Sequence, residues 1–192
     1  MKGGPAMHPD RIKWNRKFRS RRAAISVHPS DIVCNFYHLA TPGGALDIAA
    51  GNGRNALFLA QKGFAVDALD ISEAGLKMAA GQDPNFRAAC VDLDVYDLAP
   101  RRYSLVLNIR YLNRRLFPQI CEALTGGGVL IFETYLKHPN FIPQRSFRDD
   151  HLLRINELLL GFLKLEVVYY RETTAAAAGE PYPLASLVAI KR

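Results

Sequence analysis

Residues 45–72 decide the fold, and they read ALDIAAGNGRNALFLAQKGFAVDALDIS. The first part, residues 45–49, is a short apolar run interrupted by one acid, Asp47, which is typical of a buried parallel strand. Gly51 and Gly53 then predict a sharp turn, because glycine adopts positive φ freely and lets a ligand approach the bare backbone. The segment therefore begins as a strand that ends in a glycine-rich turn.

The residues after the turn complete a recognisable unit. Residues 54–62 carry apolar side chains with helical spacing, and Gly63 follows where helices commonly end. A second predicted strand, residues 64–69, leads directly to Asp70. Strand, glycine turn, helix, strand and acid together predict half of an α/β doubly wound nucleotide-binding sheet.

Two features argue against a dinucleotide ligand. The pattern Gly51-x-Gly53-x-x-Ala56 does satisfy the relaxed dinucleotide fingerprint, so that interpretation stays open. However, Asp47 places a negative charge where a pyrophosphate has no use for one, whereas the ammonium group of an amino-acid ligand needs a carboxylate. The turn also lacks the third glycine, which lets the helix approach the strand most closely.

The same residues resemble motif I and the adjoining acid of class I S-adenosylmethionine-dependent methyltransferases. Residues 46–55 are similar, more narrowly, to the tellurite-resistance-like branch of small-molecule methyltransferases. The resemblance implies S-adenosylmethionine as the cofactor, with its methionine part in the glycine turn and its ribose hydroxyls on Asp70. It also implies a Rossmann-like sheet of seven strands in the order 3-2-1-4-5-7-6, with an antiparallel C-terminal hairpin.

The predicted cofactor site follows the carboxyl ends of the strands, where ligands bind to open parallel sheets. The resemblance implies that Asp92 accepts a hydrogen bond from the adenine amino group, with the Leu93 amide beside it. For Asn52, Arg54 and Asn55, helix capping or surface exposure is the alternative role. The complete predicted set is Asp47, Ala49, Gly51, Asn52, Gly53, Arg54, Asn55, Asp70, Ile71, Ser72, Asp92, Leu93 and Asn108.

The methyl acceptor is less clearly indicated. Residues 108–111 lie where methyltransferases acting on nitrogen often carry a proline pair, and its absence here argues against that chemistry. We expect Arg110 and Arg114 to face an anionic acceptor, with exposed charges as the alternative. The candidate catalytic residues are Arg110, Tyr111, Glu133 and His138, although His138 also fits a solvated loop position. Since a soft anion needs no general base, a thiol or chalcogen anion is the favoured acceptor.

Composition predicts one domain over residues 23–192, without a membrane span, a secretory signal or a metal cluster. Cys34, Cys90 and Cys121 have no metal-ligand spacing and predict buried thiols in a reducing compartment, so we expect a cytoplasmic enzyme. The sequence does not predict an oligomeric state.

The net charge of +7 belongs to residues 1–22, because the remaining 170 residues carry equal numbers of acids and bases. This basic extension has three interpretations. It could be a solvated helix that Trp14 and Phe18 fix to the domain, an RNA anchor, or a lid over the cofactor like the N-terminal helix of the resembled family. The alternatives to a small-molecule methyltransferase are accordingly an RNA methyltransferase and a non-catalytic S-adenosylmethionine-binding protein.

Hydrophobic periodicity predicts the remaining elements. After the five parallel strands, the last two strands lack room for a crossover helix between them and must pair antiparallel. The predicted strands are 45–49, 64–69, 86–91, 103–108, 129–132, 163–171 and 184–191, and the predicted helices are about 29–39, 54–62, 72–80, 114–124 and 150–160.

Overall fold

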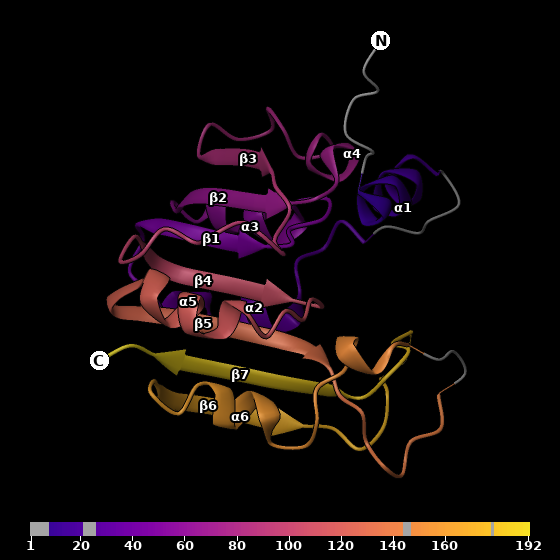
Figure 1. The fold of residues 1–192 in the computed structure, drawn as a ribbon. Coiled ribbons are helices and arrows are strands. Elements are labelled where there is room, and N and C mark those ends of the chain that lie inside the picture. The colour runs from indigo at the N-terminus through magenta and orange to yellow at the C-terminus, as the bar shows by residue number, and fades with distance from the viewer. Residues whose placement is uncertain (1–7, 21–25, 144–146, 178) are drawn as a thin grey trace.

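A computed structural model of the chain describes residues 8–20, 26–143, 147–177 and 179–192. Its sheet has seven strands in the order β3-β2-β1-β4-β5-β7-β6, which confirms the predicted topology (Figure 1). The first five strands are parallel, and β7 pairs antiparallel with both β5 and β6. The strands are β1 Gly44–Ile48, β2 Ala65–Asp70, β3 Phe86–Cys90, β4 Tyr103–Ile109, β5 Leu124–Tyr135, β6 Glu166–Glu172 and β7 Leu184–Ile190.

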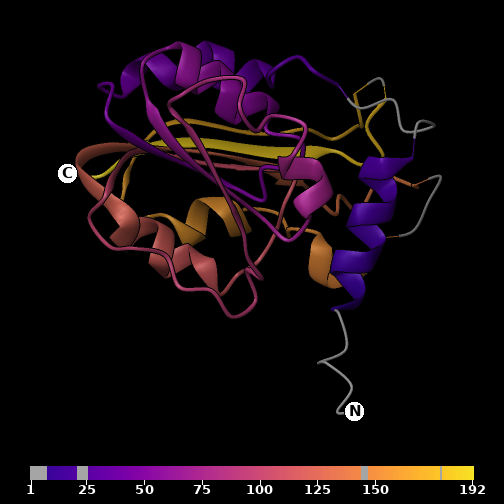
Figure 2. The same cartoon turned by 90° about the horizontal axis from the view of Figure 1, so that it is seen from above.

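Helices cover both faces of this sheet. Seen from above, α2 and α3 lie on one face and α5 and α6 on the other, while α1 lies beyond the carboxyl ends of the strands (Figure 2). The helices are α1 Pro9–Arg19, α2 Asp31–Phe36, η1 Tyr37–Leu39, α3 Arg54–Gln61, α4 Glu73–Leu76, α5 Leu116–Ala123, η2 Asp149–His151 and α6 Glu157–Gly161.

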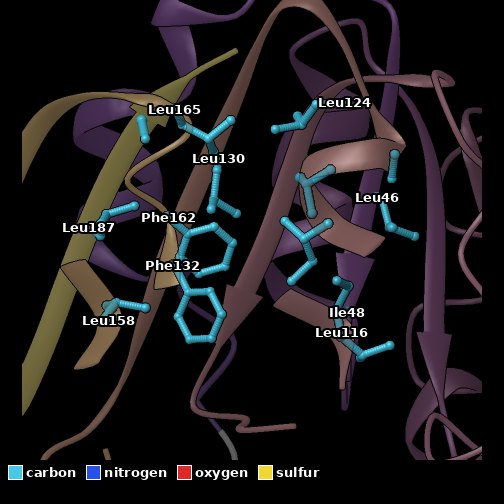
Figure 3. Close-up of a cluster of buried hydrophobic side chains, with 14 of the residues drawn as sticks. Leu46, Ile48, Leu116, Leu124, Leu130, Phe132, Leu158, Phe162, Leu165 and Leu187 are labelled. Carbon is cyan, nitrogen blue, oxygen red and sulfur yellow. The ribbon is translucent and has the colours of Figure 1, made fainter. Parts of the chain in front are cut away.

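The central strands are apolar because both of their faces are buried. In β1, Ala45 packs into the cluster under α2 and α3, whereas Leu46 and Ile48 belong to the opposite cluster with Leu116 and Phe162 (Figure 3). Alternate residues of a strand point to opposite faces, so this strand contributes to two cores. Asp47 therefore points to the α3 side, together with Ala45.

The predicted helix over residues 150–160 is wrong. Leu152 and Leu153 are instead extended and buried, and Leu153 forms a parallel bridge with Leu136 beside the end of β5. The Leu153 amide donates to the Tyr135 carbonyl at 2.9 Å, and the Leu153 carbonyl accepts from the Lys137 amide at 2.9 Å. A helical residue could not make these bonds, since its own backbone groups pair within the helix. The segment therefore splits into η2 and the short α6.

The prediction of buried thiols is also wrong in part. Cys90 is exposed, because β3 is the edge strand and most of its residues face solvent, while Cys34 and Cys121 are half-buried. None of the helices described is long and apolar enough to cross a membrane.

Candidate functional site

The turn between β1 and α3 adopts left-handed backbone conformations at three of its positions. Ala49, Gly51 and Gly53 have φ values of 55°, 60° and 75°. A Cβ on Gly53 would lie 2.5 Å from the Cβ of Ala79, so this glycine is required by packing as well as by its φ. Ala49 is not a glycine, and a left-handed alanine is backbone strain of the kind that clusters at functional sites.

Asp47 is a buried acid with an unused acceptor beside this turn. Its residue is 1% exposed, and its Oδ2 atom has no hydrogen-bond partner among the residues described. Burial and the charge of Asp70 raise the pKa of the Asp47 carboxyl to about 7, against the opposing effects of Arg54 and the Ala56 amide. An orphaned buried carboxylate oxygen is costly unless something pairs with it, and an ammonium group would do so.

Asp70 ties the end of β2 to the same turn. Its Oδ2 accepts from the Gly51 amide at 2.8 Å, and its Oδ1 accepts from the Ser72 amide at 2.7 Å. Burial raises the pKa of this carboxyl, and the amides of Ser72 and Gly51 oppose the rise. Each carboxylate oxygen has a further lone pair, so Asp70 retains acceptor capacity for hydroxyl groups.

The loop that starts at Asp92 is fixed by side chains that the sequence analysis did not single out. Arg115 Nη2 donates to the Leu93 carbonyl at 2.9 Å, and Asn113 Nδ2 donates to Asp94 Oδ1 at 3.0 Å. The Asp92 side chain itself accepts from the Asp94 amide at 3.0 Å. These bonds hold Asp92 and Leu93 in place at the carboxyl end of β3.

Tyr111, a candidate catalytic residue, faces this loop. Burial raises the pKa of its phenol to about 12, and the nearby charges of Asp94 and Asp92 contribute to the rise. Asn113 Nδ2 lies 3.4 Å from the Tyr111 hydroxyl. The side chain is therefore directed toward the predicted adenine site.

Helix α1 lies beside α4, beyond the carboxyl ends of β2 and β3 (Figure 1). Asn15 Oδ1 accepts from the Ser72 hydroxyl and from the Ala74 amide, both at 2.9 Å. A Cβ on Gly51 would meet the Phe18 ring at 3.3 Å, and a Cβ on Gly75 would meet the same ring at 3.0 Å. Phe18 thus lies over the glycine turn, as its predicted role in fixing the helix requires. The contacts of Asn15 and Gly75 with this region were not predicted from the sequence.

The other end of α1 approaches the loop at Asp92, where His8 Nε2 lies 3.9 Å from Asp92 Oδ2. The basic side chains of Lys13, Arg16 and Arg19 face solvent. Residues 1–7, Arg21 and Arg22 of the predicted extension lie outside the described residues.

Several of the predicted cofactor-binding residues make contacts within the protein. Asn52, Arg54 and Asn55 bind residues 26–30: Asn52 Nδ2 donates to the Ser26 carbonyl, Arg54 to the His28 carbonyl, and Asn55 Oδ1 accepts from the Ser30 amide. These bonds hold the chain that follows α1. Asn108 Nδ2 donates to the Tyr111 carbonyl at 2.7 Å, and the Ile71 carbonyl accepts from the Cys90 thiol.

Arg110 and Glu133, at the carboxyl ends of β4 and β5, form an ion pair. Arg110 Nη1 lies 2.6 Å from Glu133 Oε1, and Glu133 Oε2 accepts from the Ser186 hydroxyl at 2.6 Å. A second carboxylate, that of Glu180, contacts the same guanidinium at 2.6 Å. Burial disfavours the charged guanidinium, but the two glutamates raise the pKa of Arg110 above its usual value.

The expectation that Arg114 faces the acceptor is wrong. Its guanidinium forms two bonds with the Glu157 carboxylate, at 2.5 and 3.0 Å, and donates to the carbonyls of Asp150 and Leu152. Arg114 therefore fixes the irregular segment before α6. His138 accepts a hydrogen bond from the Asn140 amide within its own turn. Among the described residues, its side chain forms no hydrogen bond with Arg110 or Glu133.

The family described as tellurite resistance protein TehB matches residues 12–129 of the chain. The chain belongs to the TehB family. This membership confirms the resemblance to class I S-adenosylmethionine-dependent methyltransferases of the tellurite-resistance-like branch, and the enzyme class that it implied.

Solved structures share the fold of this TehB-family chain. TehB from Haemophilus influenzae is 17% identical with a TM-score of 0.70, over 95% of this chain and 67% of that one. Geranyl diphosphate C-methyltransferase from Streptomyces coelicolor A3(2), solved with Mg2+, geranyl diphosphate and S-adenosyl-L-homocysteine, is 13% identical with a TM-score of 0.69, over 99% and 100%. An S-adenosylmethionine-dependent methyltransferase from Mesorhizobium loti is 18% identical with a TM-score of 0.61, over 77% and 90%. None of the curated proteins compared matches in sequence.

Proposed function

We propose that this TehB-family protein transfers a methyl group from S-adenosylmethionine to a small thiol or chalcogen anion in the cytoplasm. The observation that carries the proposal is the orphaned Oδ2 atom of Asp47, which is buried beside the glycine turn. A buried acceptor without a partner fits a ligand that brings a cation to this position. The ammonium group of the methionine moiety is such a cation.

The remaining polar groups suit the other parts of the same ligand. Asp70 has free acceptor capacity for the ribose hydroxyls, and Asp92 with the Leu93 amide suits the adenine edge. When bound, S-adenosylmethionine supplies an electrophilic methyl group on a sulfonium. The protein residues then need to position the acceptor, exclude water and leave the methyl group accessible, and correct positioning contributes about 7–11 kcal/mol.

Helix α1 serves in this proposal as a lid over the cofactor, within an extension of residues 1–22 that precedes the domain of residues 23–192. Its support is the pair of hydrogen bonds that Asn15 accepts and the packing of Phe18 on Gly51. A lid that covers the reacting atoms excludes water from the sulfonium, and its opening controls exchange of the cofactor.

The candidate general bases at the ends of the strands favour a nucleophile that needs no general base. Glu133 already accepts from Arg110 and Ser186, so its carboxylate is engaged. His138 accepts from its own loop. A thiolate or selenide attacks without a general base, whereas most oxygen and nitrogen nucleophiles require one.

Thermal unfolding with S-adenosylmethionine, S-adenosylhomocysteine, NAD and NADP tests the cofactor. A ligand that binds only the folded state stabilises it by about 2.7 kcal/mol at a hundredfold excess over its dissociation constant. We expect shifts with the first two ligands alone, followed by methyl transfer to small thiols or to chalcogen anions. Shifts with the nicotinamides would overturn the proposal, and cofactor binding without transfer to any acceptor would favour a non-catalytic protein.

An RNA acceptor is the second candidate, favoured by the exposed basic side chains of Lys13, Arg16 and Arg19 on α1. It predicts RNA binding that weakens steeply with salt and that disappears in the K13Q/R16Q/R19Q variant. RNA affinity that is equal in the variant and the parent would exclude α1 as the anchor.

A further inference from the structure

The guanidinium of Arg110 has two hydrogen-bonding edges, and the two edges have different partners. Nη1 lies 2.6 Å from Glu133 Oε1. Nε and Nη2 both donate to Glu180 Oε1, at 3.1 and 2.6 Å. The Nε–Nη2 edge is a fork that matches the geometry of a carboxylate or another oxyanion.

The Glu133 side of this arrangement is built into the sheet. Glu133 lies in β5, its carbonyl accepts from the Arg110 amide at 2.7 Å, and its side chain accepts from Ser186 in β7. Its carboxylate is only 14% exposed. Glu133 therefore links Arg110, at the end of β4, to β5 and β7 and fixes its position. We assign Glu133 a positioning role.

The Glu180 side is built differently. Glu180 belongs to the connector 173–183 between β6 and β7, after Gly179, whose φ is 83°, and before Pro181. Its amide donates to the Ala177 carbonyl in a local turn, and its carboxylate is 25% exposed. The carboxylate thus reaches Arg110 from a loop outside the sheet rather than from a strand.

The Tyr135 ring lies beside the contact, at the end of a row of packed aromatic rings. The guanidinium carbon of Arg110 lies 5.6 Å from the centre of the Tyr135 ring, and Tyr135 packs edge-on against Phe147 at 5.4 Å. Tyr182, in the same connector as Glu180, packs against Phe147 at 5.0 Å. Ring faces beside a guanidinium limit its contact with water, which strengthens its attraction for an anion.

We propose that the Glu180 carboxylate occupies the place of an anionic group of the methyl acceptor, and that the acceptor is a small thiol bearing a carboxylate. The acceptor carboxylate displaces Glu180 from the Nε–Nη2 edge of Arg110, so the Glu180 side chain is the gate. This inference rests on the proposed function, in which the ends of β4 and β5 face the acceptor. The thiolate sulfur forms a bond to the methyl carbon, the electron pair of the broken carbon–sulfur bond stays on the cofactor sulfur, and the thiol proton goes to solvent.

Two thiols of similar size separate the charge requirement from thiol chemistry. We would titrate 3-mercaptopropionate and 2-mercaptoethanol into the protein, with and without S-adenosylhomocysteine, to measure binding. Methylation of both thiols is measured in a separate assay with S-adenosylmethionine. We expect the carboxylate to bind about tenfold or more tightly than the neutral thiol, as a charged hydrogen-bonded pair allows. Equal affinities for the two thiols would overturn the inference.

Three variants test the gate. Glu180→Gln keeps the side-chain shape and removes the competing charge, so the dissociation constant for 3-mercaptopropionate should fall at least threefold while that for 2-mercaptoethanol stays constant. Arg110→Lys keeps the charge but lacks the fork, so it should remove the preference for the carboxylate. Glu122→Gln makes the same chemical change on an exposed position of α5 and should change neither constant.

Unchanged affinities in Glu180→Gln, or a preference that persists in Arg110→Lys, would refute the gate. Thermal unfolding of each variant shows whether it is folded, and Glu180→Gln alone decides the question if Arg110→Lys does not fold. Because binding is measured without turnover, failure of the gate is distinct from failure of the proposed function. The latter would appear as an absent response to S-adenosylmethionine in the parent protein.

Discussion

The carboxamide oxygen of Asn15 accepts a hydrogen bond from the Ser72 hydroxyl at 2.9 Å, so that α1 is joined to the end of β2 across 57 residues of sequence. Ser72 in turn accepts from the Gly75 amide and caps α4. The cap of α4 and the position of α1 therefore share one hydroxyl group.

Asn15→Ala should accelerate the release of the cofactor. The substitution removes the acceptor of two hydrogen bonds, each of which contributes about 0.5–1.5 kcal/mol, and leaves the domain core intact. We expect S-adenosylhomocysteine to dissociate about fivefold to a hundredfold faster in stopped-flow measurements. The control is Lys13→Ala on the exposed side of α1, and equal dissociation rates in the two variants would contradict a lid fixed by Asn15.

Asp47→Asn should stabilise the cofactor-free protein at pH 8 and weaken cofactor binding. The pKa of the Asp47 carboxyl is raised from 3.8 to about 7 in the folded state, so the folded state binds this proton more tightly than the unfolded chain does. The resulting stabilisation is complete below about pH 4 and is lost as the pH rises through about 7, an effect of about 4 kcal/mol.

Urea unfolding between pH 4 and pH 8 measures this effect. The parent should lose stability over that range relative to Asp47→Asn, in which the side chain cannot ionise. The affinity of the parent for S-adenosylhomocysteine should rise from pH 5 to pH 7, because the ammonium group needs the ionised carboxyl, and the variant should lack this rise. Parallel stability curves for the two proteins would show that Asp47 is ionised in the folded state throughout.

Asp70→Asn should reduce cofactor affinity by roughly tenfold to a hundredfold, since hydrogen bonds to a charged group contribute about 1.5–3 kcal/mol. The amide also places a donor near the Gly51 or Ser72 amide, so a smaller loss of folding stability accompanies it. Calorimetric titration measures the affinity, and Asp67→Asn on the same strand is the control. Retained affinity in Asp70→Asn would show that the ribose assignment is wrong.

Gly53→Ala should destabilise the protein by about 2–4 kcal/mol. The new Cβ would lie 2.5 Å from the Cβ of Ala79, and the residue must keep a φ of 75°, so overpacking adds to backbone strain. Gly126→Ala is the matched control, because its Cβ would meet no atom within 4 Å. Urea unfolding of both variants checks the prediction, which fails if the two free energies of unfolding are the same.

The local signals in the sequence predicted the elements around the glycine turn well. The period of the apolar residues and the glycines around residue 51 predicted β1, the turn, α3 and β2 with their order, because those features depend on neighbours within a few positions. The period of the apolar residues wrongly predicted a helix over residues 150–160. There the bridge between Leu136 and Leu153 outweighs the helical pattern, and that bridge depends on a strand far away in the sequence.

The sequence by itself determined the alternating strands and helices and the antiparallel pairing of the last two strands, since both follow from spacing along the chain. The family and the order of the strands came from the resemblance of residues 46–55 to known methyltransferases. Only the tertiary structure decided which partner each charged side chain binds. Arg114 and Arg110 look alike in the sequence, yet the first binds Glu157 and the second is shared by Glu133 and Glu180. The partners are 23 to 70 residues away, and a pairing over such distances is fixed by the packing of whole elements, on which local residue spacing carries no information.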